Sequence, residues 1–138
     1  MPLRKFDEIT VGDELPERVV KLTRGDLVNY AGVSGDANPI HWSDEVVKLA
    51  GLDNVVAHGM LTMGIASSVV VAALDPQTRI LDYGVRFTKP VVVDPEHGAD
   101  VHVLATIGAV DETAARVDLK VTFGEATVLV KAQLRIAV

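Results

Sequence analysis

The residues with the clearest chemical potential lie in one short stretch, Ser34 to His41, which reads SGDANPIH. It places the carboxylate of Asp36 five positions before the imidazole of His41, in a segment that glycine, asparagine and proline make irregular. Such a pair can transfer protons, hold a metal ion as two ligands, or act as a helix cap beside a surface histidine. The spacing alone leaves all three interpretations open.

The composition limits the kind of protein that carries this pair. The chain has 138 residues, 49% of them hydrophobic, and this predicts one domain over residues 1–138 with a single buried core. It contains no cysteine, which excludes disulfides, a thiolate nucleophile and a cysteine metal site. The N-terminal MPLRKFDEIT lacks the apolar core of a signal peptide, so we expect a cytoplasmic location.

The charge of the chain argues against several classes of partner. The net charge is −6 and the pI is about 5.1, and no basic run offsets them, so nucleic acid is not an expected partner. A phosphate-bearing partner would need a local basic patch. The sequence contains no GxGxxG, no phosphate-binding loop and no G-x-S-x-G nucleophile.

One apolar stretch, VVAHGMLTMGIASSVVVAAL from Val55 to Leu74, approaches the length of about 20 residues that a membrane span needs. Glycine, serine and threonine dilute its hydrophobicity, and Asp53 and Asp75 flank it in place of lysine or arginine. A globular protein needs such a helix when a sheet packs around it. We therefore expect a buried helix over Met60–Leu74 and no membrane partner.

The remaining elements are read from alternation and caps. Val117, Leu119, Val121 and Phe123 alternate with polar residues, which is typical of a strand with one wet face. Similar patterns predict strands at 17–22, 80–93, 99–110, 115–123 and 127–138, the last three as an antiparallel meander. The strand at 80–93 is expected to be interrupted or bent near Lys89-Pro90, because proline cannot donate to a ladder. Thr23 with Asp26 predicts a helix through about Val33, and Ser43 caps a short helix ending at Gly51. The expected class is α+β, with a curled antiparallel sheet around a long apolar central helix.

The stretch YAGVSGDANPIHWSDEVVKLAG, Tyr30 to Gly51, resembles the signature of the MaoC-like family, also called hydratase 2. VVAHGMLTMGIASS follows at the expected distance, and FDEITVGDELP and DYGVRFTKPV extend the resemblance over most of the chain. It is most similar to the small catalytic subunit of the heterodimeric (3R)-hydroxyacyl-ACP dehydratase of type II fatty-acid elongation.

The resemblance implies a hot-dog fold and (R)-specific hydration or dehydration of trans-2-enoyl and (3R)-3-hydroxyacyl thioesters. The thioester is carried by CoA or by acyl carrier protein, and no cofactor is implied. The implied assembly is a homodimer or a heterodimer with a related hot-dog subunit. Carrier, acyl length and partner stay open.

The resemblance also assigns roles to residues. Asp36 and His41 match the pair that activates water and supplies a proton, without deciding which does which. Gly59 corresponds to the glycine whose backbone N–H, at the start of the central helix, meets the enolate oxygen. Ser67 corresponds to a helix serine that orients Asp36.

Further residues support these roles. Asn38, together with Pro39, is expected to fix the loop at the substrate site, and Arg86 and Lys89 are expected to form a cationic patch for the carrier. His58 is expected to support the site without donating a proton.

Three alternatives remain to be weighed. Asp36, His41 and His58 could form a metal site, since two histidines and one carboxylate are a common ligand set, although no metal is expected. A hot-dog thioesterase commonly carries a carboxylate on its central helix, and Met60–Leu74 contains none. A non-catalytic acyl-binding subunit would not need the Asp36–His41 pair.

Overall fold

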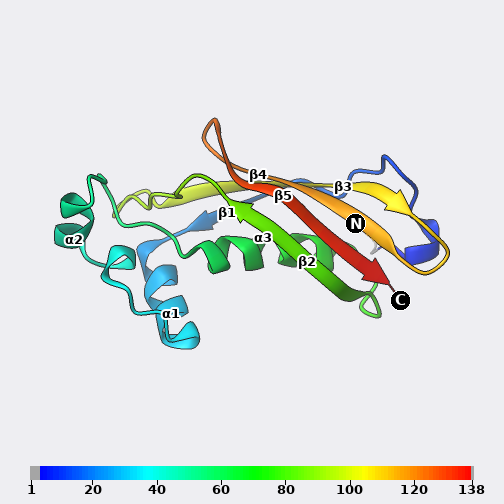
Figure 1. The fold of residues 1–138 in the computed structure, drawn as a ribbon, viewed down its shortest axis with the longest axis horizontal. Helices are drawn as coiled ribbons and strands as arrows, with labels where there is room; N and C mark the ends of the chain where they lie inside the picture. The colour runs from blue at the N-terminus through cyan, green and yellow to red at the C-terminus, as the bar shows by residue number, and fades with distance from the viewer. Residues whose placement is uncertain (1–3, 138) are drawn as a thin grey trace.

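The computed structural model describes residues 4–137, which form an open five-stranded antiparallel sheet with the long helix α3 along one face (Figure 1). The strand order across the sheet is β1-β3-β4-β5-β2. The strands are β1 (Arg18–Leu22), β2 (Arg79–Phe87), β3 (Ala99–Val110), β4 (Ala115–Phe123) and β5 (Ala126–Ala137). The helices are α1 (Arg24–Ser34), α2 (Asp44–Leu49) and α3 (Gly59–Ala73), with 3-10 turns η1 (Phe6–Glu8) and η2 (Pro39–His41).

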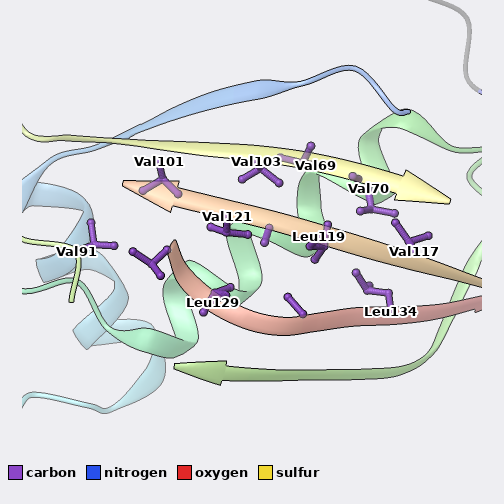
Figure 2. Close-up of a cluster of buried hydrophobic side chains, with 14 of the residues drawn as sticks. Val69, Val70, Val91, Val101, Val103, Val117, Leu119, Val121, Leu129 and Leu134 are labelled. Carbon is purple, nitrogen blue, oxygen red and sulfur yellow. The ribbon is translucent and has the colours of Figure 1, made fainter. Parts of the chain in front are cut away.

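The core lies between α3 and one face of the sheet. In β3, Val101, Val103 and Ile107 are buried and alternate with more exposed residues, as the period of a half-buried strand requires. Figure 2 shows strand side chains such as Leu119 directed toward Val69 and Val70 of α3. Burial of this shared apolar surface holds α3 against the sheet. Among the described residues, no helix is long and apolar enough to cross a membrane.

A bulge in β5 bends the sheet beside this core. The register with β4 shifts between Leu119 and Val121, so three steps along β5 oppose two along β4. Lys131 adopts a φ of 52° at this point, a left-handed conformation that is uncommon outside glycine. A second register shift follows between Val121 and Thr122 of β4, where Leu129 and Thr127 of β5 oppose adjacent residues, and Val128 and Leu129 are both buried there.

The comparison with the expected elements is close. The α+β hot-dog class is confirmed, with the sheet open and α3 resting on one face. The interruption expected near Lys89-Pro90 is confirmed: β2 ends at Phe87, Pro90 has no N–H to continue the ladder, and the residues beyond it up to Val93 are not part of the strand. The strand expected at 127–138 begins at Ala126, and Val138 lies outside the described residues.

Candidate active site

The loop after α1 is organised by side chains that bond to its own backbone. Gly35 ends α1 in a left-handed conformation with a φ of 77°, and the next amide, of Asp36, donates to Ser34 Oγ at 3.1 Å. Asp36 Oδ1 accepts from the amide of Asn38 at 3.2 Å, and Asn38 Oδ1 caps η2 by accepting from the amide of Ile40 at 3.2 Å. These bonds fix the backbone between Asp36 and η2, which carries His41.

His41 is buried, and its two ring nitrogens face different partners. Nδ1 lies 2.6 Å from the carbonyl oxygen of Val56, and a carbonyl can only accept, so Nδ1 carries the hydrogen. In the neutral ring the lone pair is therefore on Nε2, which faces Asp36 Oδ2 at 3.7 Å. Two acceptors cannot hydrogen-bond each other directly, but at this separation both can accept from one water molecule between them.

The segment that receives His41 is tied to the body of the protein on both sides. The amide of Val56 donates to the carbonyl of Ile40 at 3.0 Å, and the amide of Ala57 donates to the carbonyl of Val91 at 2.8 Å. Val93 donates to the carbonyl of Val55 at 2.8 Å. The carbonyl of Val56, which accepts the hydrogen bond from His41, is thus fixed relative to the core.

Arg24, in the first turn of α1, joins four parts of the chain around this loop. Its Nε donates to the carbonyl of Val93 at 3.0 Å, and its Nη2 donates to Asn54 Oδ1 at 3.0 Å. Its Nη1 also pairs with Asp44 Oδ1, in α2, at 2.9 Å. Because most of the Arg24 side chain is covered, this planar group can act as a fixed link between α1, α2 and the core.

The first turn of α3 presents unsatisfied backbone donors. The amides of Leu61 and Thr62 donate to the carbonyl of His58, whereas within residues 4–137 those of Gly59 and Met60 donate to no backbone carbonyl. The helix dipole adds positive potential at this end. A side chain on Gly59 would place its Cβ 2.9 Å from the ring of Phe87, so glycine permits this close approach.

A cavity of about 290 Å³ opens beside these groups. Its polar lining comes from His41, Thr62, Thr88 and Lys89, with Gly59 beside them, and the rest of its wall is apolar. The lining residues are Ile40, His41, Val56, Ala57, Gly59, Thr62, Phe87, Thr88, Lys89, Pro90, Val91, Val128 and Leu129. Val128 and Leu129 line it from the irregular part of β5. An imidazole, a free amide and an apolar chamber therefore share one space, as small-molecule sites require.

The structure brings some of the expected site residues together and leaves others apart. Asp36 faces His41, and His41, Gly59 and Lys89 line the same cavity. Ser67 does not hydrogen-bond Asp36 in the described structure; its hydroxyl donates to the carbonyl of Gly64 at 2.9 Å, as serines inside helices commonly do. The role expected for Ser67 stays a prediction.

Two other expected substrate contacts lie outside the cavity lining. Asn38 bonds within its own loop, and Arg86 is exposed on β2. Their assigned roles also stay predictions.

The geometry tests the metal interpretation. Ligand atoms of Asp36, His41 and His58 lie within 4.8 Å of one another. The two imidazoles are stacked, however, with centroids 3.6 Å apart and planes inclined by 18°. Ring lone pairs lie in the ring planes, so nearly parallel stacked rings do not direct two nitrogens at one ion.

Sequence reasoning missed two neighbours of the site. The stacking of His58 on His41 joins residues that are 17 positions apart, and Phe87 approaches Gly59 of α3 from the end of β2. No local pattern indicates such contacts. The family resemblance includes the blocks VVAHGMLTMGIASS, which contains His58 and Gly59, and DYGVRFTKPV, which contains Phe87. It does not show that these two blocks are in contact.

Comparison with known proteins adds to this geometry. The MaoC like domain matches residues 8–126. The 3-hydroxyacyl-thioester dehydratase X of Mycobacterium tuberculosis is 37% identical over 83 residues, spanning 60% of this chain and 29% of that protein. The (R)-specific enoyl-CoA hydratase of Rhodospirillum rubrum is 28% identical over 137 residues, spanning 95% of this chain and 94% of that protein.

A solved structure described as a MaoC-like dehydratase superposes with a TM-score of 0.91 at 41% identity, covering 98% of this chain and 42% of the other. The chain thus spans less than half of that structure and of the dehydratase X. The match of the MaoC like domain nevertheless extends over most of the sequence, from η1 to the start of β5. The chain belongs to the MaoC-like family.

Proposed function

We propose that this protein catalyses the reversible, (R)-specific hydration of trans-2-enoyl thioesters to (3R)-3-hydroxyacyl thioesters. The observation that carries the proposal is the pair of facing acceptors, Asp36 Oδ2 and His41 Nε2, 3.7 Å apart. The names of the matched relatives, a hydratase and a dehydratase, support the same reaction class.

The geometry suggests how the pair acts. A water molecule that donates one hydrogen to Asp36 and the other to His41 keeps its oxygen lone pair free for C3 of the enoyl group. As the C–O bond forms at C3, one of the two residues takes a proton from the water, the C2–C3 π pair becomes a C1–C2 π bond, and the carbonyl π pair moves onto the thioester oxygen to give an enolate. A proton held by the Asp36–His41 pair is then delivered to C2, and the carbonyl reforms. The dehydration reaction follows the same steps in reverse.

The negative charge that develops on the thioester oxygen needs a donor. The amide of Gly59, free of an intrahelical partner at the positive end of α3, supports this role. We propose that the hydroxyl of Ser67 orients Asp36 by a hydrogen bond when substrate is bound. For this, the hydroxyl must turn away from the carbonyl of Gly64, to which it donates in the structure. No step of the reaction requires a cofactor.

The substrate carrier is assigned to CoA or acyl carrier protein. Lys89 lines the cavity, and Arg86 is exposed on β2 three residues before it. Both side chains are proposed to bind the phosphates of CoA or an acidic carrier protein. Asn38 is proposed to act on substrate through the shape of the loop. A cytoplasmic location and a single domain over residues 1–138 remain predictions from the sequence.

A second hot-dog chain, identical or related, is the proposed partner. β2 is an edge strand, and most of its residues are exposed, including Ile80, Leu81 and Phe87. An unpaired edge that carries exposed apolar side chains is suited to pairing with another strand.

Substitution of the facing pair tests the function. Asp36→Asn and His41→Gln should each lower kcat for hydration of crotonyl-CoA by on the order of a hundredfold or more, because an amide can still accept a hydrogen bond from the water but cannot take or return its proton. Loss of enoyl absorbance, measured beside free thiol, separates hydration from thioester hydrolysis. The thermal midpoint of Asp36→Asn should stay near that of the parent, because the Asp36 side chain is 53% exposed.

The matched control is Asp53→Asn, an exposed aspartate outside the loop. It should retain parental activity. The proposal fails if Asp36→Asn hydrates at the parental rate, and a thioesterase is indicated if thiol is released at the rate at which the thioester is consumed.

A further inference from the structure

His58 connects the two proposed proton-transfer residues from behind. Its side chain is 2% exposed, and its Nε2 lies 3.1 Å from the backbone carbonyl oxygen of Asp36. The carbonyl can only accept, so Nε2 carries the hydrogen and Nδ1 is bare in the neutral ring. Within the described chain, this buried Nδ1 has no hydrogen-bond partner.

The face of the same ring supports His41. The two imidazoles stack with centroids 3.6 Å apart, and Tyr30 of α1 meets His58 edge-on at 4.8 Å with an interplanar angle of 69°. The backbone carbonyl of His58 accepts the first hydrogen bonds of α3, from Leu61 and Thr62. One residue therefore joins the start of α3, the backbone of Asp36 and the ring of His41.

The surroundings of His58 keep it uncharged. Burial lowers the pKa of His58 below the usual 6.5, because the charged ring would lose its hydration. Its hydrogen bond to the Asp36 carbonyl opposes this shift, the neighbouring His41 adds to it, and the Asp36 carboxylate opposes it. Tyr30 is the other titratable group in contact with the ring.

His58 is not placed to exchange a proton with substrate. Neither His58 nor Asp36 lines the cavity that His41 and Gly59 share, but the Asp36 side chain is 53% exposed whereas His58 is only 2% exposed. Its Nε2 is occupied by a backbone acceptor, and its bare Nδ1 is buried. His58 can therefore affect the reacting atoms only indirectly, through its contacts with Asp36 and His41.

We propose that His58 is a positioning residue, whose neutral imidazole holds Asp36 and His41 at their working separation. The N–H fixes the backbone that carries the carboxylate, and the ring face fixes the plane of His41. An uncharged neighbour also leaves room for a positive charge on His41 when that ring holds a proton. This inference rests on the proposed hydration reaction.

Two substitutions separate the two contacts. His58→Phe keeps a flat ring and removes the N–H, whereas His58→Gln keeps an N–H donor and removes the ring. We expect kcat for crotonyl-CoA hydration, per folded molecule, to fall on the order of tenfold to a hundredfold in at least one variant, with KM within about twofold, because a displacement near 1 Å costs about this much rate. His102→Phe and His102→Gln, on the exposed face of β3, are the matched controls and should keep parental kcat.

A second measurement does not depend on activity. Nitrogen-15 spectra of the histidine rings in the parental protein should show the Nε2–H tautomer for His58 and the Nδ1–H tautomer for His41. A pH titration should place the midpoint of His58 below 6.5. This ring binds a proton less readily folded than unfolded, so the free energy of unfolding should fall as the pH drops below 6.5, and less so in His58→Phe.

The outcomes distinguish the two proposals. Parental kcat in both folded His58 variants overturns the positioning role, and so does an Nδ1–H tautomer or a midpoint at or above 6.5. If a variant does not fold, the tautomer and titration of the parental protein decide. Absence of hydration by the parental protein would refute the proposed function, whereas the ring spectra would still test the contacts of His58.

Discussion

At the scale of single residues, the approach to the amide of Gly59 is shared by glycine and one aromatic ring. Phe87 lies close enough that a Cβ on Gly59 would sit 2.9 Å from its Cε1. The ring is partly exposed and lines the cavity, so it borders the route by which a thioester would reach the first turn of α3. Access to the amide therefore depends on two residues from different elements.

This crowding gives a test that separates stability from activity. Gly59→Ala should leave α3 at least as stable, because alanine has the higher helix propensity, yet it should lower kcat/KM about tenfold or more by displacing Phe87 into the approach. Adding Phe87→Ala should recover part of the loss, so the double-mutant cycle in kcat/KM is non-additive. Parental kcat/KM in Gly59→Ala would show that the approach is not limited by this contact.

At the scale of elements, the sequence was most informative where a pattern is local. The meander β3–β4–β5 could be predicted from alternation, and the caps of α1 and α2 from Thr23 and Ser43, whose side chains accept from the amides expected of capping residues. The bulge at Lys131 could not, because alternation was read as continuous through that point. Residues 88–93 were included in the expected strand because three consecutive valines follow Pro90, yet Val91 and Val93 pack in the core and the segment pairs only through the bridge between Val92 and Val56.

The same distinction applies to the site. Asp36 and His41 could be predicted because one loop carries both and the family motif is short. The tautomer of His41 depends on Val56, and the stacking depends on His58, which are contacts across the fold. Spacing within one loop cannot predict contacts with residues that reach the site from other parts of the chain.

The segment that leaves β2 provides a test at this scale. Lys89 lines the cavity and Arg86 does not, so Lys89→Glu should raise KM for crotonyl-CoA severalfold at low salt and less at high salt, with a smaller effect from Arg86→Glu. Lys120→Glu, exposed on β4, is the control for added negative charge. An unchanged KM at low ionic strength in Lys89→Glu would remove Lys89 from carrier binding, and an unchanged KM in Arg86→Glu would remove Arg86.

At the scale of the whole molecule, the two edges of the sheet differ. β1 is short, with five residues, whereas β2 has nine and carries exposed Ile80 and Leu81 near its start. Met60 and Val71 add exposed apolar surface on α3. Because long apolar edges favour strand pairing, β2 is the edge that we expect a second hot-dog chain to cover.

Charge on each edge tests this assignment. Leu81→Lys should lower the mass measured by sedimentation toward that of one chain, or abolish binding of a related subunit, because a buried lysine would be unpaired in the interface. Val19→Lys, which places the same charge on exposed β1, should leave assembly unchanged. Equal loss of assembly in the two variants would contradict an interface at β2.

The strand order also determines which strand pairings enclose the longest loops of chain. β3, β4 and β5 are consecutive in sequence, so each pairs with the next across a short turn. β1 joins β3 only after α1, α2, α3 and β2 have intervened, as in the pairing of Arg18 with Val103. Closing such a loop costs more chain entropy than closing a hairpin. The segment enclosed by that loop carries Asp36, His41 and Gly59, so the ordering of the site is coupled to the most non-local pairing in the sheet.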